Sequence, residues 1–200
     1  MDIILVFLST PVLIPVMLLC SIAIWLDSEG PILFVQDRIG KGGRMFRMYK
    51  FRSMHVSSTD ISSRSYMKAY IRGDLANNIQ GQTIFKPSHT QRITRVGHFL
   101  RKSSLDELPQ LLNVIKGEMS IVGPRPNVPW EVDEYRPWHY ERFEVMPGIT
   151  GLAQVRGRSC INFIDLVRYD IEYIEKQSLL LDMKIIWWTL LSILTGHGAK

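Results

Sequence analysis

Residues 103–126 read SSLDELPQLLNVIKGEMSIVGPRP, a helical pattern followed by a short strand and a proline-rich turn. Ser104 and Glu107 have the spacing of a capping box, which predicts a helix that begins here. Apolar side chains then recur at helical spacing until Gly117, namely Leu105, Leu108, Leu112 and Ile115. One amphipathic helix is therefore expected, with Asp106 and Glu107 in its first turn.

The two adjacent acids have an ordinary explanation, because carboxylates are favoured near the positive end of a helix and Glu107 can complete the capping box. Adjacent helical residues project about 100° apart, so Asp106 and Glu107 are not expected to share one proton. They suit separate roles, in which one carboxylate attacks a phosphorus atom and the other holds magnesium. The helix end is expected to keep both ionised.

The turn that follows suggests what the acidic pair acts on. Residues 119–122 are predicted to form a short strand, after which the chain turns through GPRP at 123–126. The two prolines stiffen the backbone around Arg125. A guanidinium group donates two parallel hydrogen bonds from a planar fork, which suits a phosphate.

Composition describes a folded chain with a locally basic surface. Of the 200 residues, 46% are hydrophobic and 22% are charged, which argues against disorder and allows one proper core. The formal net charge is +5, and basic residues gather beside a single acid, Asp37, at Arg38, Lys41, Arg44, Arg47, Lys50 and Arg52. Such a surface suits nucleic acid, anionic lipid or phosphorylated substrates, and composition does not choose among them. Cys20 and Cys160 show no metal-ligand or disulfide spacing, which favours a cytoplasmic setting.

The first residues predict a membrane anchor, which decides against nucleic acid as a partner. Residues 3–26 carry no charged side chain and could cross roughly 30 Å of hydrocarbon as a straight helix. No lysine or arginine precedes them, which argues against a cleaved signal peptide. Thr10-Pro11 and Pro15 interrupt the run, which leaves a spanning helix and a kinked helix that returns on one face both open. Basic residues after the run place its C-terminal side in the cytoplasm.

The remaining patterns predict a compact α+β domain, because short strands, amphipathic helices and glycine loops lack the repeated β-α-β order of a doubly wound sheet. Residues 32–54 predict a hairpin around a glycine-rich turn, and residues 93–102 an amphipathic basic segment. A short helix is expected at 66–71. The aromatic residues between 130 and 140 suit either a membrane interface or packing on the core.

The motifs LDELPQ and GPRP resemble those of the bacterial sugar transferases, the monotopic polyprenol-phosphate phosphoglycosyl transferases. Further matches extend over nearly the whole chain: FVQDRIG at 34–40, YKFRSM at 49–54 and PGITGLAQV at 147–155. The resemblance implies a re-entrant helix over residues 1–28, broken at Thr10 and Pro11, and a cytoplasmic catalytic domain over 29–200. It also implies a variable insertion at about 55–91 and a C-terminal interfacial helix at about 179–195. Relatives usually carry basic residues before the anchor. We therefore expect that the natural chain starts upstream or that the given sequence has been trimmed.

By the same resemblance, Asp106 is the nucleophile and Glu107 the ligand of a Mg²⁺ cofactor. The residues assigned to phosphate or substrate binding are Lys50, Arg52, Arg125, Pro126, Gly148, Thr150, Gly151, Gln154 and Arg158. Met146 and Arg156 depart from the residues common in the family, so nucleotide or sugar preference is expected to differ.

The implied reaction transfers a sugar-1-phosphate from a nucleotide diphosphate sugar to polyprenol phosphate through a covalent aspartyl phosphosugar. It would take place at the cytoplasmic face of the bacterial inner membrane and initiate polysaccharide or glycoconjugate assembly. Inner membrane lipids and downstream glycosyltransferases would be partners, with a homo-oligomer also possible. Two alternatives stay open: a non-catalytic membrane adaptor of a polysaccharide assembly complex, which needs no acidic pair, and a nucleotide-sugar hydrolase that uses water instead of the lipid.

Overall fold

The computed structural model describes residues 1–55, 61–74, 93–157 and 161–195. Its elements, with 3-10 helices labelled η, follow in the order α1 (Asp2–Asp27), β1 (Leu33–Ile39), η1 (Lys41–Gly43), β2 (Met45–Phe51), α2 (Ile61–Arg72), α3 (Arg95–Lys102), η4 (Leu105–Gln110), α4 (Leu111–Ile115), β3 (Ser120–Val122), α5 (Pro129–Val132), η5 (Pro137–Phe143), β4 (Gly148–Thr150), α6 (Leu152–Gly157), α7 (Phe163–Glu175) and α8 (Leu179–Leu194). The mixture of helices with small sheets confirms the predicted combination of α and β structure. Helices also occur at 66–71, 95–102 and 179–194, as expected.

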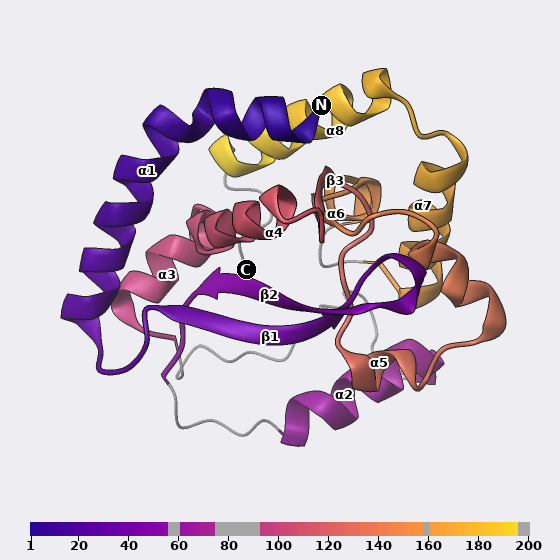
Figure 1. Cartoon of the computed structure of the whole chain (residues 1–200). Helices are drawn as coiled ribbons and strands as arrows, with labels where there is room; N and C mark the ends of the chain where they lie inside the picture. Colours follow the sequence, from indigo (N-terminus) through magenta and orange to yellow (C-terminus); the bar gives the residue numbers. More distant parts are fainter. Residues whose placement is uncertain (56–60, 75–92, 158–160, 196–200) are drawn as a thin grey trace.

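Two small sheets organise the chain. Strands β1 and β2 form the predicted antiparallel hairpin, in which Val35 lies opposite Tyr49. Gly42 and Gly43 in its turn have positive φ angles of 65° and 74°, which favour glycine. Strands β3 and β4 pair in parallel. In Figure 1 the hairpin crosses the middle of the molecule, with α3 and α4 on one side and α2 and α5 on the other.

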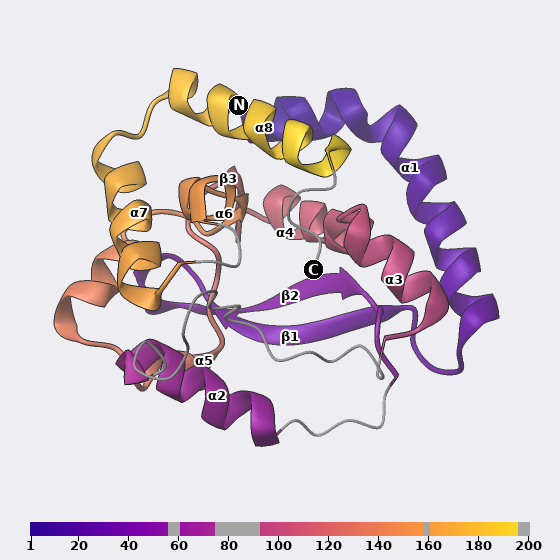
Figure 2. The ribbon, with the colours of Figure 1, turned by 180° about the vertical axis from the view of Figure 1, so that it is seen from behind.

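Helix α1 is continuous but not straight, and its ribbon changes direction along its length in Figures 1 and 2. Pro11 and Pro15 lie inside it and cannot donate backbone hydrogen bonds. The hydroxyls of Ser9 and Thr10 donate back to the carbonyls of Leu5 and Val6, both at 2.8 Å. Bonds of this kind often bend a helix. A re-entrant path through a bilayer stays a prediction.

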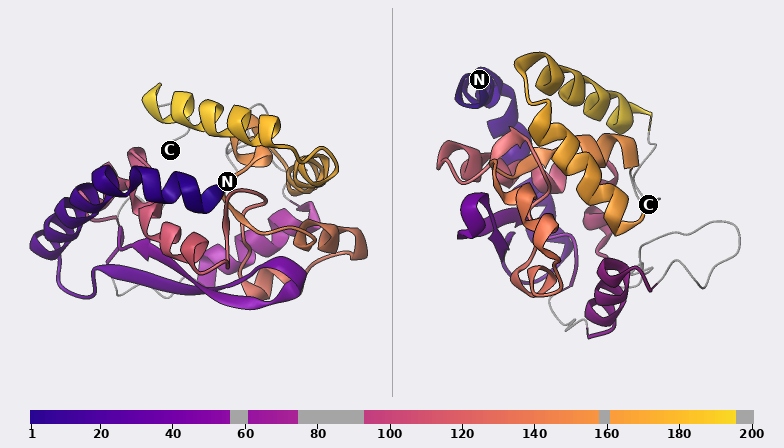
Figure 3. Two further views of the ribbon diagram at one scale, coloured as in Figure 1. Left: turned by 45° about the horizontal axis from the view of Figure 1, so that its top comes forward. Right: turned by 90° about the vertical axis from the view of Figure 1, so that its right-hand side faces the viewer.

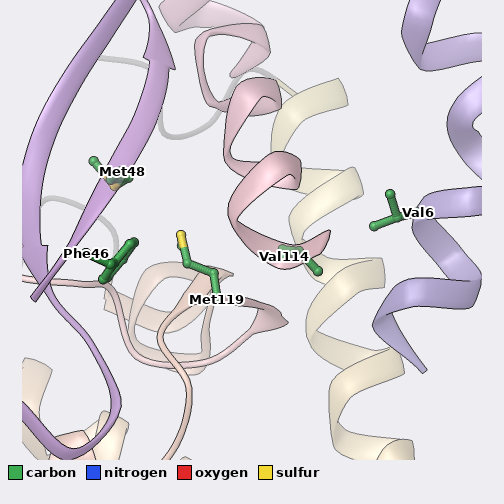
Figure 4. Packing of buried hydrophobic residues seen from close by; sticks show 5 residues of the cluster. All are labelled: Val6, Phe46, Met48, Val114 and Met119. Carbon is green, nitrogen blue, oxygen red and sulfur yellow. The ribbon is translucent and has the colours of Figure 1, made fainter. Parts of the chain in front are cut away.

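Helix α1 contributes to the core as well as to the surface. Val6 belongs to a buried cluster with Phe46, Met48, Val114 and Met119 (Figure 4). Cys20 and Ile24 of the same helix pack in a second cluster with Phe51 and Leu100. Therefore α1 is packed against the residues that follow the predicted boundary at 28–29, through side chains from both of its halves.

Helices α1 and α8 lie on the same side of the molecule in the two views of Figure 3. Both expose large apolar side chains, among them Phe7, Leu8, Leu18, Leu19, Trp25, Leu26, Leu179, Leu180, Met183 and Trp187. Among the described residues, α1 is the one helix whose length and composition would allow it to cross a membrane. The two helices therefore give this side of the molecule an apolar surface.

Two of the aromatic residues of the 130–140 region pack on the core, which is one of the two environments left open by the sequence. Tyr135 and Trp138 pack against a buried cluster formed by Ile71, Phe163 and Val167, which links α2 to α7. Tyr140 is exposed. Packing on the core therefore explains Tyr135 and Trp138.

Candidate active site

The acidic pair lies in a tighter helix than the sequence suggested. Residues 105–110 form the 3-10 helix η4, and a separate short helix, α4, begins at Leu111. Pro109 inside η4 has no N–H to donate, which interrupts regular α-helical bonding. The predicted capping box is wrong: Ser104 has a positive φ of 57°, and its carbonyl, not its side chain, accepts the Glu107 N–H at 3.2 Å.

The predicted continuous apolar stripe is also wrong, because the segment contains two helices of different type. Leu105 and Leu108 pack beside the cluster of Phe51 and Leu100, whereas Leu112 and Ile115 are exposed. A change from one helix type to another rotates the later side chains away from the first face. The predicted end of the helix is confirmed, because α4 stops at Ile115 and Gly117 has a positive φ of 72°.

Three separate parts of the sequence meet at Glu107. The Lys50 Nζ of β2 lies 2.8 Å from Glu107 Oε1, and the Arg125 Nη1 lies 3.4 Å from the same oxygen. The Lys50 and Glu107 side chains are largely buried, while 47% of the Arg125 side chain is exposed. The structure therefore brings together the acidic pair, the YKFRSM lysine and the GPRP arginine.

The surroundings shift the pKa values of the two acids in opposite directions. Burial alone would raise the pKa of Glu107, but the charges and hydrogen bonds of Lys50 and Arg125 lower it to about 2. Burial and the neighbouring Glu107 charge raise the pKa of Asp106 above its ordinary value. Ionisation of Glu107 thus follows from two cations, rather than from the helix end that the sequence suggested.

Asp106 also differs from Glu107 in its contacts. Across the described parts of the chain, the Asp106 carboxylate makes no hydrogen bond or ion pair, whereas Glu107 makes two. Burial and the charge of Arg125 lower the pKa of Lys50, although the charge of Glu107 opposes this shift. Among the described residues, the site thus contains one carboxylate held by two cations beside one without such contacts.

Arg38 is a member of this site that the sequence prediction left out. It donates from Nη1 to the Pro126 carbonyl at 2.9 Å and from Nη2 to Gln36 Oε1 at 2.6 Å. Burial and the charge of Arg125 lower the pKa of Arg38 to about 10. Its place in the FVQDRIG motif was the available signal, because Arg38 contacts the GPRP turn and Gln36 of the same motif accepts from it.

Arg142 supports the GPRP turn from behind and had no signal in the sequence. This buried side chain donates to the Arg125 carbonyl at 3.3 Å and to the Tyr135 hydroxyl at 2.7 Å, and it pairs with Asp170 of α7. Burial raises the pKa of Asp170 to about 6 against the opposing charge of Arg142. A buried ion pair thus holds the backbone that presents Arg125.

The glycine-rich PGITGLAQV segment is not one of the glycine loops expected from the sequence: it forms β4 and most of α6, and β4 bonds to the GPRP turn through the Gly148 N–H to the Pro124 carbonyl at 2.9 Å. A Cβ on Gly148 would lie 2.1 Å from the Gly123 nitrogen, and one on Gly151 would lie 2.2 Å from the Gly123 carbonyl oxygen. Thr150 shares a hydrogen bond of 2.7 Å with Thr189, and Gln154 donates to the Ile149 carbonyl at 3.0 Å. These contacts are structural, and a role of the four predicted residues in substrate binding stays a prediction.

Two further predicted residues have other surroundings. Arg52 is buried and donates to the carbonyls of Ser28 at 2.6 Å and Glu29 at 2.9 Å, so it holds the end of α1 instead of contacting the acidic pair. The Pro126 carbonyl accepts from Arg38 as described above. Arg158 lies outside the described residues.

The donor set limits which metal the site could take. Among the residues with described positions, no group of three or more histidine, cysteine, aspartate or glutamate side chains is arranged to hold a metal ion. Magnesium is commonly bound through one or two carboxylates, with water and substrate phosphates as the other ligands. Asp106 and Glu107 fit that mode and do not fit an all-protein metal cage.

Comparisons with known proteins match nearly the whole chain to one family. The family model described as bacterial sugar transferase matches residues 1–196. The galactosyl transferase CpsE of Streptococcus agalactiae serotype III (strain NEM316) is 42% identical over 191 residues, which cover 92% of this chain and 40% of that protein. The UDP-N-acetylgalactosamine-undecaprenyl-phosphate N-acetylgalactosaminephosphotransferase of Aeromonas hydrophila is 39% identical over 206 residues, which cover 100% of this chain and 44% of that protein.

A third relative is matched over more of its length. The UDP-glucose:undecaprenyl-phosphate glucose-1-phosphate transferase of Caulobacter vibrioides (strain ATCC 19089 / CIP 103742 / CB 15) is 40% identical over 209 residues, which cover 100% of this chain and 70% of that protein. The chain spans less than half the length of the first two relatives. Because the family model covers all but the last residues, the chain belongs to the bacterial sugar transferase family.

Proposed function

We propose that this chain transfers a sugar-1-phosphate from a nucleotide diphosphate sugar to polyprenol phosphate. Relatives that cover the whole chain are named as undecaprenyl-phosphate sugar phosphotransferases, which supports this class of reaction. The observation that carries the proposal is the asymmetry of the acidic pair. Glu107 is held by Lys50 and Arg125, while Asp106 beside it is free of such contacts among the described residues.

The proposed chemistry has two displacements at the phosphorus atom that bears the sugar. An Asp106 carboxylate oxygen attacks this phosphorus, the bond to the bridging oxygen breaks, and the nucleoside monophosphate leaves with that oxygen. A phosphate oxygen of polyprenol phosphate then attacks the same phosphorus. The bond to Asp106 breaks, which restores the carboxylate and gives polyprenol diphosphate sugar.

Lys50 and Arg125 would provide positive charge for the donor phosphates. In the structure they share Glu107 Oε1, so an arriving phosphate can replace Glu107 as the partner of either cation. The exposed Arg125 is the more accessible of the two. Arg38 and Arg142 keep its turn in place through the carbonyls of Pro126 and Arg125.

Glu107, with Asp106 beside it, would hold the proposed Mg²⁺. When bound, the ion supplies positive charge that offsets the negative charge of the transferring phosphoryl group. Release of Glu107 from Lys50 and Arg125 by donor phosphates would leave its carboxylate available as a ligand.

The proposed membrane placement follows from the need to meet a soluble donor and a lipid acceptor at one site. The exposed apolar side chains of α1 and α8 support contact with the bilayer by the side of the molecule that they share. We assign α1 a re-entrant path, α8 an interfacial position and the rest of the chain the cytoplasmic face. Residues 1–28 would then form an anchor that is packed on the catalytic part.

The test is to incubate the purified protein with magnesium and a panel of nucleotide sugars, with and without polyprenol phosphate. Repeated turnover, with more than one nucleoside monophosphate released per protein, is expected for one donor and only with the lipid. Equal turnover without the lipid would indicate a hydrolase, and no release from any donor would leave the adaptor. The Asp106→Asn protein is expected to lose turnover, and a near-normal rate would exclude Asp106 as the nucleophile.

A further inference from the structure

A buried asparagine connects the acidic segment to the strand that carries Lys50. Asn113 of α4 is completely buried, with 0% of its surface exposed. Its Oδ1 accepts the backbone N–H of Tyr49 at 3.1 Å, and its Nδ2 donates to the Arg47 carbonyl at 2.7 Å. Backbone groups two positions apart on a strand point to the same edge, so one side-chain amide can bond both. Asn113 therefore occupies one edge of β2, while β1 pairs along the other.

The orientation of this amide is fixed. The second hydrogen of Asn113 Nδ2 is donated to Glu118 Oε2 at 2.7 Å, so both of its N–H groups and its oxygen have partners. Lys50 follows Tyr49 directly along β2. Glu107 lies in η4, which continues directly into the helix of Asn113. The asparagine thus connects the backbones that carry the two members of the Lys50–Glu107 pair.

The hairpin needs such a connection, because an isolated two-stranded sheet is only marginally stable. β1 and β2 form a sheet of two strands. We propose that Asn113 is a positioning residue, which sets the distance between the Lys50 amine and the Glu107 carboxylate and so the arrangement of the acidic pair. Its effect on catalysis rests on the proposed function, but its effect on the Lys50–Glu107 distance does not.

The first measurement reads this distance without any substrate. The full chain in detergent micelles is treated with a zero-length carbodiimide, and amide bonds between lysine and glutamate are quantified by peptide mass spectrometry. The wild type should give a Lys50–Glu107 cross-link, because the two groups lie 2.8 Å apart. The Asn113→Ala protein should lose it. The surface pair Lys176–Glu172, at 3.0 Å, serves as the internal control and should cross-link equally in both proteins.

The second measurement is turnover, with Val167→Ala as the matched control. Val167 is fully buried in α7 and belongs to a cluster that contains no residue of β2, so this substitution destabilises the chain without disturbing Lys50. We expect Asn113→Ala to lower kcat about 10- to 100-fold at a temperature where both variants are folded, because small displacements of reacting groups have effects of that size. Val167→Ala should keep most of the wild-type kcat.

Each outcome decides the proposal. An unchanged Lys50–Glu107 cross-link in folded Asn113→Ala protein would overturn it, and so would an equal loss of kcat in Val167→Ala. If Asn113→Ala does not fold, Asn113→Asp replaces it, since this isosteric change keeps the acceptor for Tyr49 and removes the donor to Arg47; the same loss of cross-link is expected. A wild type without transfer activity but with an Asn113-dependent cross-link would refute the proposed function and leave the positioning role standing.

Discussion

Removal of the Lys50 charge should destabilise the protein through Glu107. The fall of the Glu107 pKa from its ordinary 4.5 to about 2 corresponds to about 3 kcal/mol in favour of the ionised, paired state. Lys50 is the nearer and more buried of the two cations. The substitution also removes the cost of burying the Lys50 charge, which offsets part of this loss. We therefore expect Lys50→Met to lower the free energy of unfolding by about 1–3 kcal/mol at pH 7.

The matched control is Arg125→Met. Arg125 contacts the same oxygen, but at 3.4 Å and with nearly half of its side chain exposed, so its loss should cost less than about 1 kcal/mol. Both variants and the wild type would be unfolded with denaturant in a mild detergent, followed by circular dichroism. Arg125→Met is expected to remain close to the wild type.

The pH dependence gives the same experiment a second criterion. The folded-state pKa of Glu107 lies below its unfolded value, so the stability that its ionised form contributes is complete above about pH 4.5 and is lost as the pH falls toward 2. The difference between wild type and Lys50→Met should therefore be constant from pH 7 to about pH 5 and shrink below it. Equal destabilisation by both substitutions, or a difference that persists at low pH, would show that Lys50 does not stabilise the ionised form of Glu107.

Three further results are expected. Burial and the charges of Arg136 and Arg142 lower the pKa of His139 to about 4, so stability should fall between about pH 6.5 and pH 4 by at most about 3 kcal/mol, and denaturation of His139→Gln should lack this step. Gly148→Ala should not accumulate as folded protein, because its Cβ would overlap backbone; normal yield and melting temperature would contradict the close packing. Glu107→Gln should lose the magnesium dependence of turnover, and an unchanged metal titration would remove Glu107 as a ligand.

Local patterns predicted the elements whose signals lie close together in the sequence. The hairpin of residues 33–51 followed from alternation around a glycine-rich turn, and the end of α4 followed from Gly117. The capping box failed because Ser104 adopts a left-handed conformation instead of the extended one that a capping residue needs, which spacing alone does not reveal. The sequence did not decide between a membrane interface and core packing for Tyr135 and Trp138, because the choice depends on which distant helices they contact.

Charged residues of the site that belong to recognisable motifs were predictable from the sequence. Arginines that bind backbone carbonyls were not. Lys50, Glu107 and Arg125 were all expected from motifs, and the structure brings them together. Arg52 looked equivalent to Lys50 from its position in the same motif, yet it holds the end of α1. Arg142 depends on a tertiary contact with residues of α7, for which no local pattern exists.

Intact-mass analysis can detect the proposed covalent phosphosugar on Asp106 itself. Protein is mixed with magnesium and the donor that yields monophosphate, without polyprenol phosphate, and quenched before the mass is measured. We expect a mass increase equal to one phosphosugar, located by peptide mapping at Asp106, absent in Asp106→Asn and discharged when polyprenol phosphate is added. An adduct on another residue, or lipid-dependent turnover with no adduct at any time, would contradict it.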